Sequence, residues 1–279
     1  MYKLPIAQTI DGFVSWMEKS WGPALDAFSE VFGDIIEAVT DGLNFVPWWV
    51  IVIIVALIAF KTNGLKFLIG SVLGLVLIWN LNLWPAFIAT LVLVLFSSVI
   101  SMMIGFPLGI ISGKSEKFNM VIMPVLDFMQ TMPSFVYLIP ALLMFGIGQV
   151  PAIFATVIFS MPPIIKLTDL GIRQVPDDLI EVGESFGCTP IQLLFKIQLP
   201  VAIPTIMTGV NQTMMLALSM VVVSAMIGAG GLGAGVLQAI SQLKNGMGFE
   251  YGIAVVIMAI ILDRILQGIG KKMQVEEKH

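Results

Sequence analysis

Cysteine and histidine are almost absent from this sequence. Among its 279 residues there is one cysteine, Cys188, and one histidine, His279, which is the last residue. A disulfide within the chain needs two cysteines, and most catalytic triads and transition-metal sites need histidine or several cysteines. The sequence therefore excludes an internal disulfide framework, a cysteine-rich metal site and a histidine-based active site. We expect no catalytic residue, no metal site and no enzymatic activity in this chain.

Charged residues are also scarce, at 11% of the sequence, whereas 58% of the residues are hydrophobic. A typical soluble domain is about 25% charged. A helix that crosses a bilayer needs roughly 20 predominantly apolar residues, and the sequence contains several such runs. The composition therefore predicts an all-α polytopic protein embedded in a lipid bilayer, with no nucleic-acid partner.

Seven apolar stretches predict membrane spans. They lie at about 47–60, 66–80, 84–112, 120–146, 149–166, 201–227 and 250–270. The basic residues then divide between the two sides as Lys61, Lys66, Lys114, Lys117, Lys166, Arg173, Lys196, Lys271, Lys272 and Lys278 against Lys3, Lys19 and Lys244. Cytoplasmic loops carry the excess of Lys and Arg, so we expect the N-terminus outside and the C-terminus in the cytoplasm. The first two spans are short, and a re-entrant pair in their place would leave later loops on the same sides.

The first 45 residues do not resemble a secretory signal, because they lack a basic start and contain acidic residues throughout. Apolar residues recur among them at steps of three and four, at Ile10, Phe13, Val14, Met17, Trp21, Leu25, Phe28, Phe32, Ile35 and Val39. This spacing predicts an amphipathic helix on the outer side, broken at Gly22-Pro23. The helix is expected to lie along the membrane surface or against the protein.

A polar loop in the second half of the chain contains its own helix signals. Pro176 stands where a helix should begin, and the acidic residues after it favour a helix N-terminus. We expect a short helix to about Phe186, ended by a left-handed turn at Gly187. Thr189-Pro190-Ile191-Gln192 has the pattern of a capping box and predicts a second short helix, which Pro200 would end.

The same loop resembles the cytoplasmic coupling motif of ABC importer permeases, which reads Glu-Ala-Ala, three residues, Gly, nine residues, Ile-x-Leu-Pro. Here Glu181-Val182-Gly183 is followed at those spacings by Gly187 and by Ile197-Gln198-Leu199-Pro200, so both alanines are replaced. Three further stretches, 127–140, 161–176 and 216–233, resemble permeases for glycine betaine and proline betaine. Together with the coupling motif they cover most of residues 84–270. The chain is therefore similar to the permease subunit of a type I ABC importer for quaternary amines.

The resemblance implies a type I importer fold of about seven spans plus the N-terminal helix. It divides the chain into an outer region at 1–45, two accessory spans at 46–82, a permease core at 83–272 with a coupling loop at 167–200, and a cytoplasmic tail at 273–279. It also implies three partners: a separate ABC ATPase that holds ATP and Mg²⁺, an extracellular substrate-binding protein and a second copy of this chain. The implied coupling residues are Glu181, Gly183, Glu184, Gly187, Ile197, Leu199 and Pro200.

The translocation path is expected to follow the most polar spans. The fourth span contains several prolines, which free backbone carbonyls and so favour a position beside a cavity. A trimethylammonium group donates no hydrogen bond, so aromatic faces and polar side chains are suitable contacts. The candidates are Asp127, Gln130, Thr131, Phe135, Tyr137, Asn211, Gln212 and Ser219. Asp127 is expected at a depth similar to that of Arg264 and either pairs with it or finds a backbone or water partner.

Two other functions stay open. An ion-coupled secondary transporter or channel for small zwitterions would also use interrupted helices and a membrane-embedded Asp127. An aspartyl enzyme would need Asp127 and Asp263, although neither lies in a recognisable catalytic motif. The sequence contains no G-x-x-x-x-G-K-[ST] pattern, so an ATP-driven mechanism requires the separate ATPase. The choice among betaine, carnitine, choline and proline stays open as well.

Overall fold

The computed structural model describes residues 6–276, and every element in that range is helical. The α-helices are α1 (Ile6–Phe45), α2 (Trp48–Asn63), α3 (Leu65–Asn80), α4 (Trp84–Lys114), α5 (Glu116–Thr131), α6 (Leu138–Phe145), α7 (Gln149–Ser160), α8 (Pro162–Arg173), α9 (Asp177–Ser185), α10 (Pro190–Leu193), α11 (Leu199–Val223), α12 (Gly231–Ser241) and α13 (Asn245–Glu276). Short 3₁₀ turns occupy Ser134–Tyr137 and Ser224–Ile227, and a π-helical turn occupies Leu194–Gln198. Lys3, Lys278 and His279 lie outside the described residues, as do the side chains of Lys19 and Lys272 and of the apolar positions from Ile10 to Met17.

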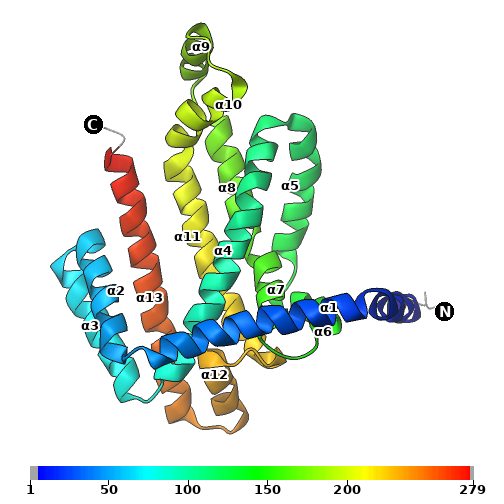
Figure 1. Ribbon diagram of the computed structural model, residues 1–279, viewed down its shortest axis with the longest axis vertical. Helices are drawn as coiled ribbons and strands as arrows, with labels where there is room; N and C mark the ends of the chain where they lie inside the picture. Colours follow the sequence, from blue (N-terminus) through cyan, green and yellow to red (C-terminus); the bar gives the residue numbers. More distant parts are fainter. Residues whose placement is uncertain (1–5, 277–279) are drawn as a thin grey trace.

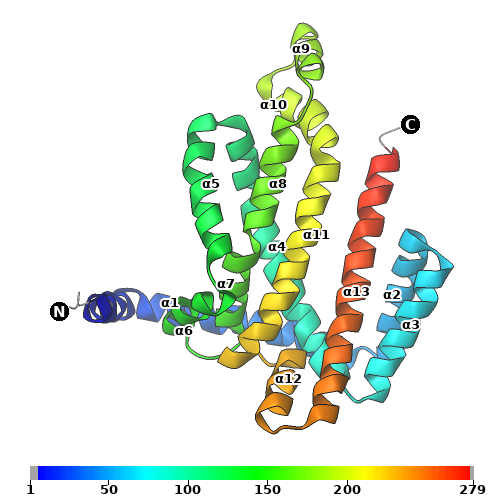
Figure 2. The same ribbon diagram turned by 180° about the vertical axis from the view of Figure 1, so that it is seen from behind.

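Long helices run side by side through the molecule, and α9 with α10 projects beyond one end (Figure 1). The opposite end carries α12, and α1 crosses the bundle at a steep angle to the other helices (Figures 1 and 2). Each of the seven expected apolar stretches coincides with one or more helices. In the described part, four helical stretches are long and apolar enough to cross a membrane, or up to six if each of two bent helix pairs counts as one span. The bundle is therefore a multi-pass membrane protein.

The N-terminal helix packs against the protein, which was one of its two expected positions. Phe32 stacks on Phe28 and meets Phe96 of α4 edge-on, with ring centroids 6.2 Å apart, and Ile36 is fully buried. The expected break at Gly22-Pro23 is wrong, because α1 continues through Pro23. A proline inside a helix removes one backbone hydrogen bond, and in a 40-residue helix the neighbouring turns continue past it.

The two short helices α2 and α3 form a hairpin on the side of the bundle. Gly64 joins them in a left-handed turn with φ +79°. The Asn63 side-chain amide donates a hydrogen bond of 2.6 Å to the backbone carbonyl of Arg264 in α13. This contact fastens the hairpin to α13, as the neighbouring ribbons in Figure 2 show.

Helices α4 and α8 pack at very short range through glycines on α4. A Cβ atom at Gly105 would lie 2.4 Å from Ile164 Cγ2, and one at Gly109 would lie 2.5 Å from Thr168 Cβ and 2.8 Å from the Ile165 carbonyl oxygen. Small residues at a membrane helix interface let the backbones approach, so that van der Waals contact replaces the hydrophobic drive available in water. Removing these glycines would force the two helices apart.

The expected fourth span is not one helix. It breaks after Thr131, and the two parts are bent by 109°. Pro133 has no N–H to donate to the Met129 carbonyl, four residues earlier, so that carbonyl loses its helical partner. The Tyr137 hydroxyl donates a hydrogen bond to the same carbonyl. The bend brings Tyr137 back beside α5, and its hydrogen bond to the Met129 carbonyl stabilises the break.

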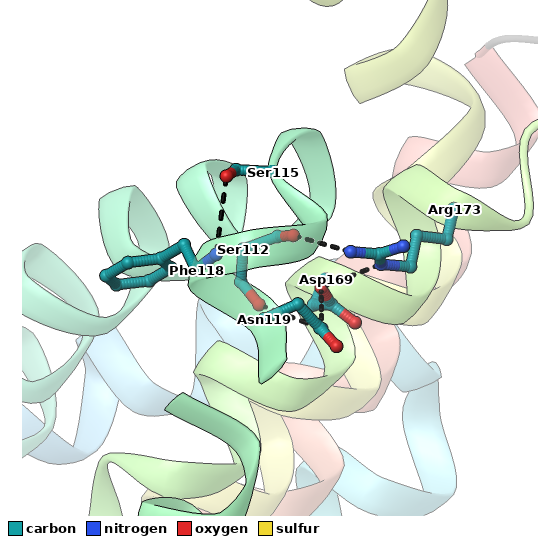
Figure 3. Close-up of polar contacts among 6 residues, drawn as sticks. All are labelled: Ser112, Ser115, Phe118, Asn119, Asp169 and Arg173. Atoms are coloured by element: carbon teal, nitrogen blue, oxygen red, sulfur yellow. Dashed lines mark hydrogen bonds and ion pairs between the residues drawn. The ribbon is translucent and has the colours of Figure 1, made fainter. Parts of the chain in front are cut away.

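Polar side chains join the ends of α4, α5 and α8 (Figure 3). Asp169 is 5% exposed and accepts hydrogen bonds from the Asn119 amide, at 2.8 Å, and from Arg173 Nε, at 3.1 Å. The Asn119 amide also donates to Ser112 Oγ at 3.1 Å, and Arg173 Nη2 donates to the Ser112 carbonyl near the end of α4 at 2.8 Å. We call these four residues the Asp169 network. It fixes the end of α8 immediately before the projecting α9.

The glycine packing yields a first prediction. Gly109→Ala should lower the free energy of unfolding by about 1–3 kcal/mol, because its new methyl group meets the Ile165 backbone, which has little room to move. Gly70→Ala is the matched control, since a Cβ at this exposed helical glycine meets nothing within 4 Å. The measurement is the melting temperature of the detergent-purified protein. Equal melting of the two variants would contradict the close packing.

The Asp169 network yields a second prediction. Asp169→Ala should cost about 1–3 kcal/mol of stability because it leaves Arg173 and Asn119 without their acceptor. Asp169→Asn retains an acceptor oxygen but loses the charge, so its melting temperature should fall between those of the wild type and the alanine variant. Glu250→Ala, which removes an exposed carboxylate, serves as the control. An alanine variant as stable as this control would mean that the network does not hold the helices together.

Candidate functional site

The projecting segment, residues 177–200, is the first candidate site, and we call it the knob. Helix α9 starts at Asp177, so Pro176 is the residue before the helix and not its first member. The helix ends in a Schellman motif: the N–H of Cys188 donates to the Gly183 carbonyl at 3.0 Å, and the N–H of Gly187 donates to the Glu184 carbonyl at 2.8 Å. Gly187 has φ +77°, which confirms the predicted left-handed turn.

The second helix of the knob starts as the sequence predicts. The Thr189 N–H donates to Gln192 Oε1 at 2.9 Å, and the Gln192 N–H donates to Thr189 Oγ1 at 3.3 Å, which completes the capping box. The predicted end of this helix at Pro200 is wrong. The chain continues through the π-helical turn into α11, and Leu199 donates its N–H to the Leu194 carbonyl, five residues back. The wider turn gives the Leu199 N–H an acceptor and lets the helix pass Pro200, whose nitrogen has no hydrogen to donate, so the knob continues directly into a long membrane helix.

Gly183 brings the two helices of the knob together. It is buried, and a Cβ atom there would lie 2.5 Å from Ile197 Cδ1 and 2.7 Å from Leu193 Cδ1. The replacement of an alanine of the coupling motif by this glycine therefore allows a closer approach of α9 to α10 and the π-helical turn, before Leu199 begins α11. Leu199 and Pro200 are half-buried where that helix begins.

The outer surface of the knob is unusually apolar for a part that lies beyond the bundle. Val182 is 51% exposed, Phe186 86%, Ile191 70% and Phe195 62%. Glu181 and Glu184 are exposed on the same short helix. Figure 1 shows that no other element of the chain covers α9. An exposed apolar surface with charged residues around it, outside the membrane part of a protein, indicates a docking surface for another protein.

A second candidate site contains an ion pair at membrane depth. Lys166 Nζ lies 2.7 Å from Asp127 Oδ1, and it also donates a hydrogen bond to Gln130 Oε1. Lys166 was expected in a cytoplasmic loop, but α7 and α8 form one apolar stretch from Gln149 to Arg173 that contains it. Lys166 was not among the predicted site residues, because the sequence does not show that the apolar stretch continues from α7 through α8.

The hypothesis that Asp127 pairs with Arg264 is wrong. Asp127 binds Lys166, and the carboxylate beside Arg264, that of Asp263, accepts hydrogen bonds from Asn211 at 2.9 Å and from Gln267 at 2.8 Å. The depth estimate placed Asp127 and Arg264 at similar levels, but their helices lie on different sides of the bundle (Figure 2). Similar depth does not bring two residues together.

The other candidate path residues divide into exposed and internal ones. Thr131, Phe135, Gln212 and Ser219 are exposed, as are Asp127 and Gln130. Tyr137 is 7% exposed and donates its hydroxyl to the Met129 carbonyl of α5, and Asn211 is held by Asp263, so these two serve packing in this structure. Thr208, Gln212 and Ser219 follow each other at helical spacings along one exposed side of α11. We call these exposed polar side chains of α5 and α11, together with the partly exposed Lys166 of α8, the polar face.

Known proteins resemble this chain along nearly its whole length. It is 47% identical over 270 residues to the glycine betaine transport system permease protein OpuAB of Bacillus subtilis, covering 97% of this chain and 96% of the relative. It is 48% identical over 277 residues to the glycine betaine/carnitine transport permease protein GbuB of Listeria monocytogenes, covering 98% of each. It is 44% identical over 268 residues to the glycine betaine/proline betaine transport system permease protein ProW of Escherichia coli, covering 96% of this chain and 76% of the relative.

A solved structure shares the fold. The inward-facing MetNI methionine ABC transporter matches 66% of this chain and 93% of its own chain with a TM-score of 0.61 at 20% identity. The expected type I importer fold is therefore confirmed. The family described as "Binding-protein-dependent transport system inner membrane component" matches residues 105–275, which include the knob and most of the polar face. This chain belongs to that family of inner membrane transport components.

Proposed function

We propose that this protein is the permease subunit of an ATP-driven importer of glycine betaine or a related quaternary amine, such as proline betaine, carnitine or choline, and that it serves osmoprotection. The observation that carries the proposal is the knob, a projection with exposed apolar side chains that follows α8 after a short link at 174–176 and continues into α11. The near full-length similarity to three permeases whose names include glycine betaine supports the substrate class.

The knob docks on a separate ABC ATPase, which binds ATP and Mg²⁺. Phe186 and Phe195 supply large apolar contacts, whereas Glu181 and Glu184 provide charges around them. This assignment places the knob in the cytoplasm. The C-terminal end of α13 lies toward the same end of the bundle in Figure 1, so the C-terminus is cytoplasmic as well. The N-terminus and α12 then belong to the outer side, where the substrate-binding protein docks.

A second copy of the chain completes the translocation path. Exposed polar side chains on membrane helices are costly against lipid, so the polar face requires water or protein beside it. Two copies that meet with their polar faces toward each other enclose such a space. Phe128 and Phe135, which are 65% and 54% exposed, supply aromatic faces that attract a trimethylammonium group.

Transport follows an alternating-access cycle. ATP binding brings two ATPase subunits together, and each moves the knob seated on it. Because the knob continues into α11 and is linked to the end of α8 by residues 174–176, these helices move with it. The path then opens outward toward the binding protein, and ATP hydrolysis returns it to the inward-open state.

Reconstitution tests the proposed function directly. Liposomes that contain this chain, its partner ATPase and its binding protein should take up labelled glycine betaine only with ATP, and omission of any one component should abolish uptake. Uptake by this chain alone, driven by an ion gradient, would overturn the proposal in favour of a secondary transporter.

Gly187 tests the role of the knob. Gly187→Val puts a β-branched residue at φ +77°, which costs about 1–3 kcal/mol locally, whereas Gly187→Asn introduces a residue that tolerates this conformation. No side chain lies within 4 Å of a Cβ at this position, so the strain is confined to the turn. We expect the valine variant to insert into the membrane normally but to lose coupling, with roughly tenfold less uptake per ATP hydrolysed. The asparagine variant should stay close to the wild type; equal uptake by both variants would exclude a role for the turn.

A further inference from the structure

Two ion pairs in this chain differ sharply in their accessibility. The Asp169 side chain is 8% exposed and Arg173 33%, and both are held by neighbours on three helices. The Asp127 side chain is 69% exposed, and its partner Lys166 is 25% exposed. An ion pair that only fastens helices is best shielded, as the first pair is. The second pair leaves its carboxylate open to whatever fills the space beside it.

The exposed pair lies at membrane depth. Asn119 and Asp169 touch each other and therefore share a level near the cytoplasmic end of the bundle. Asp127 follows Asn119 by eight residues, or about 12 Å along α5, and Lys166 precedes Asp169 by three residues, or about 4.5 Å along α8. The lysine side chain extends across the remaining difference to meet the carboxylate. Charges at this depth are too costly to face lipid, so they face a water-filled path or another protein.

The neighbouring part of α11 is polar at the same level. Gly209 of α11 packs on α8 so closely that a Cβ atom there would lie 3.0 Å from Leu167 Cβ, next to Lys166. Thr208 and Gln212 flank this contact and are exposed. On the other side, Phe128 is exposed beside Asp127. Exposed polar and aromatic residues therefore occur on α5 itself and on α11, the helix that packs against α8.

We propose that Lys166 and Asp127 form a dipolar site for zwitterionic substrates in the translocation path. The site rests on the proposed transport function and specifies how the path recognises its substrate. In the empty state the two side chains neutralise each other, as the structure has them. A zwitterion in the path replaces this ion pair with two new ones. Its carboxylate pairs with the Lys166 ammonium, and its quaternary ammonium pairs with the Asp127 carboxylate and contacts the Phe128 ring face.

The exchange keeps every charge paired. Two ion pairs replace one ion pair and a solvated zwitterion, so no unpaired charge is left at membrane depth. A purely cationic substrate such as choline would occupy Asp127 but leave Lys166 without a partner. A purely anionic substrate would leave Asp127 unpaired. The site therefore favours molecules that carry both charges, and the binding stays weak because the resting ion pair competes with the substrate.

The decisive variants are Asp127→Asn, Lys166→Gln and the double variant D127N/K166Q. Each single variant leaves one charge unpaired, so it would impair either a structural pair or a binding site. The double variant removes both charges, and a merely structural pair would tolerate this with restored uptake. A binding site would not tolerate the loss of both charges. We therefore expect the double variant to take up glycine betaine about tenfold more slowly than the wild type, although its melting temperature is normal. Lys117→Gln, which removes an exposed lysine from the same helix as Asp127, should transport normally.

Binding provides a readout that does not depend on coupling or on the binding protein. Saturation-transfer NMR on the permease–ATPase complex in nanodiscs should detect the trimethyl protons of glycine betaine, with a weaker signal for choline. In Lys166→Gln the order should reverse, because Asp127 then attracts a cation without a competing lysine. Restored uptake in the double variant, or an unchanged preference in Lys166→Gln, would overturn the dipolar site. Failure of the wild type to take up glycine betaine in the reconstituted system would instead overturn the proposed function, so the two failures are distinguishable.

Discussion

The close contact between α4 and α8 is the constraint on which the rest of the structure depends. Glycines on α4 let the two backbones approach until added methyl groups would collide with Thr168 and the Ile165 carbonyl. The Asp169 network then fixes the end of α8 at the membrane boundary. Because α9 follows α8 after a short link, any force on the knob reaches a helix that has little freedom to slide. Tight packing of this kind converts a local displacement into movement of whole helices.

Prolines shape the elements that surround this contact. Pro133 ends α5 and sends the chain into a sharp bend, and the Tyr137 hydroxyl takes over the carbonyl that Pro133 leaves free. Pro200 has the opposite effect, because a π-helical turn before it lets the helix continue. In a membrane each freed backbone group must find a partner within the protein. Whether a helix breaks at a proline or continues past it thus depends on which partner is available to the backbone group that loses its helical hydrogen bond. That partner need not be a neighbour in sequence.

This difference explains which parts of the site could be predicted from the sequence. The turn at Gly187 and the cap at Thr189 depend on residues within a few positions, so their local pattern sufficed. The partner of Asp127 depends on which helices are neighbours, and α8 adjoins α5 whereas α13 lies beside the α2–α3 hairpin. Hydropathy gives the depth of a residue but not the side of the bundle that it faces. The sequence also placed Lys166 at the surface because the continuous passage of α7 into α8 was not visible in it.

The two ion pairs of this protein differ in accessibility, as the two roles we propose for them require: Asp169 and Arg173 hold helices together, and Asp127 and Lys166 bind a substrate. A charge that holds helices together gains most when its partners surround it and water is excluded, which is the case for Asp169. A charge that serves a moving solute must stay accessible and must be neutralised while it waits, because an unpaired charge at membrane depth destabilises the bundle. Asp127 meets both requirements through Lys166, a long side chain on a neighbouring helix. In the proposed transport cycle Lys166 belongs to the part of the bundle that the partner ATPase moves, because α8 packs closely on α4 and leads into the knob.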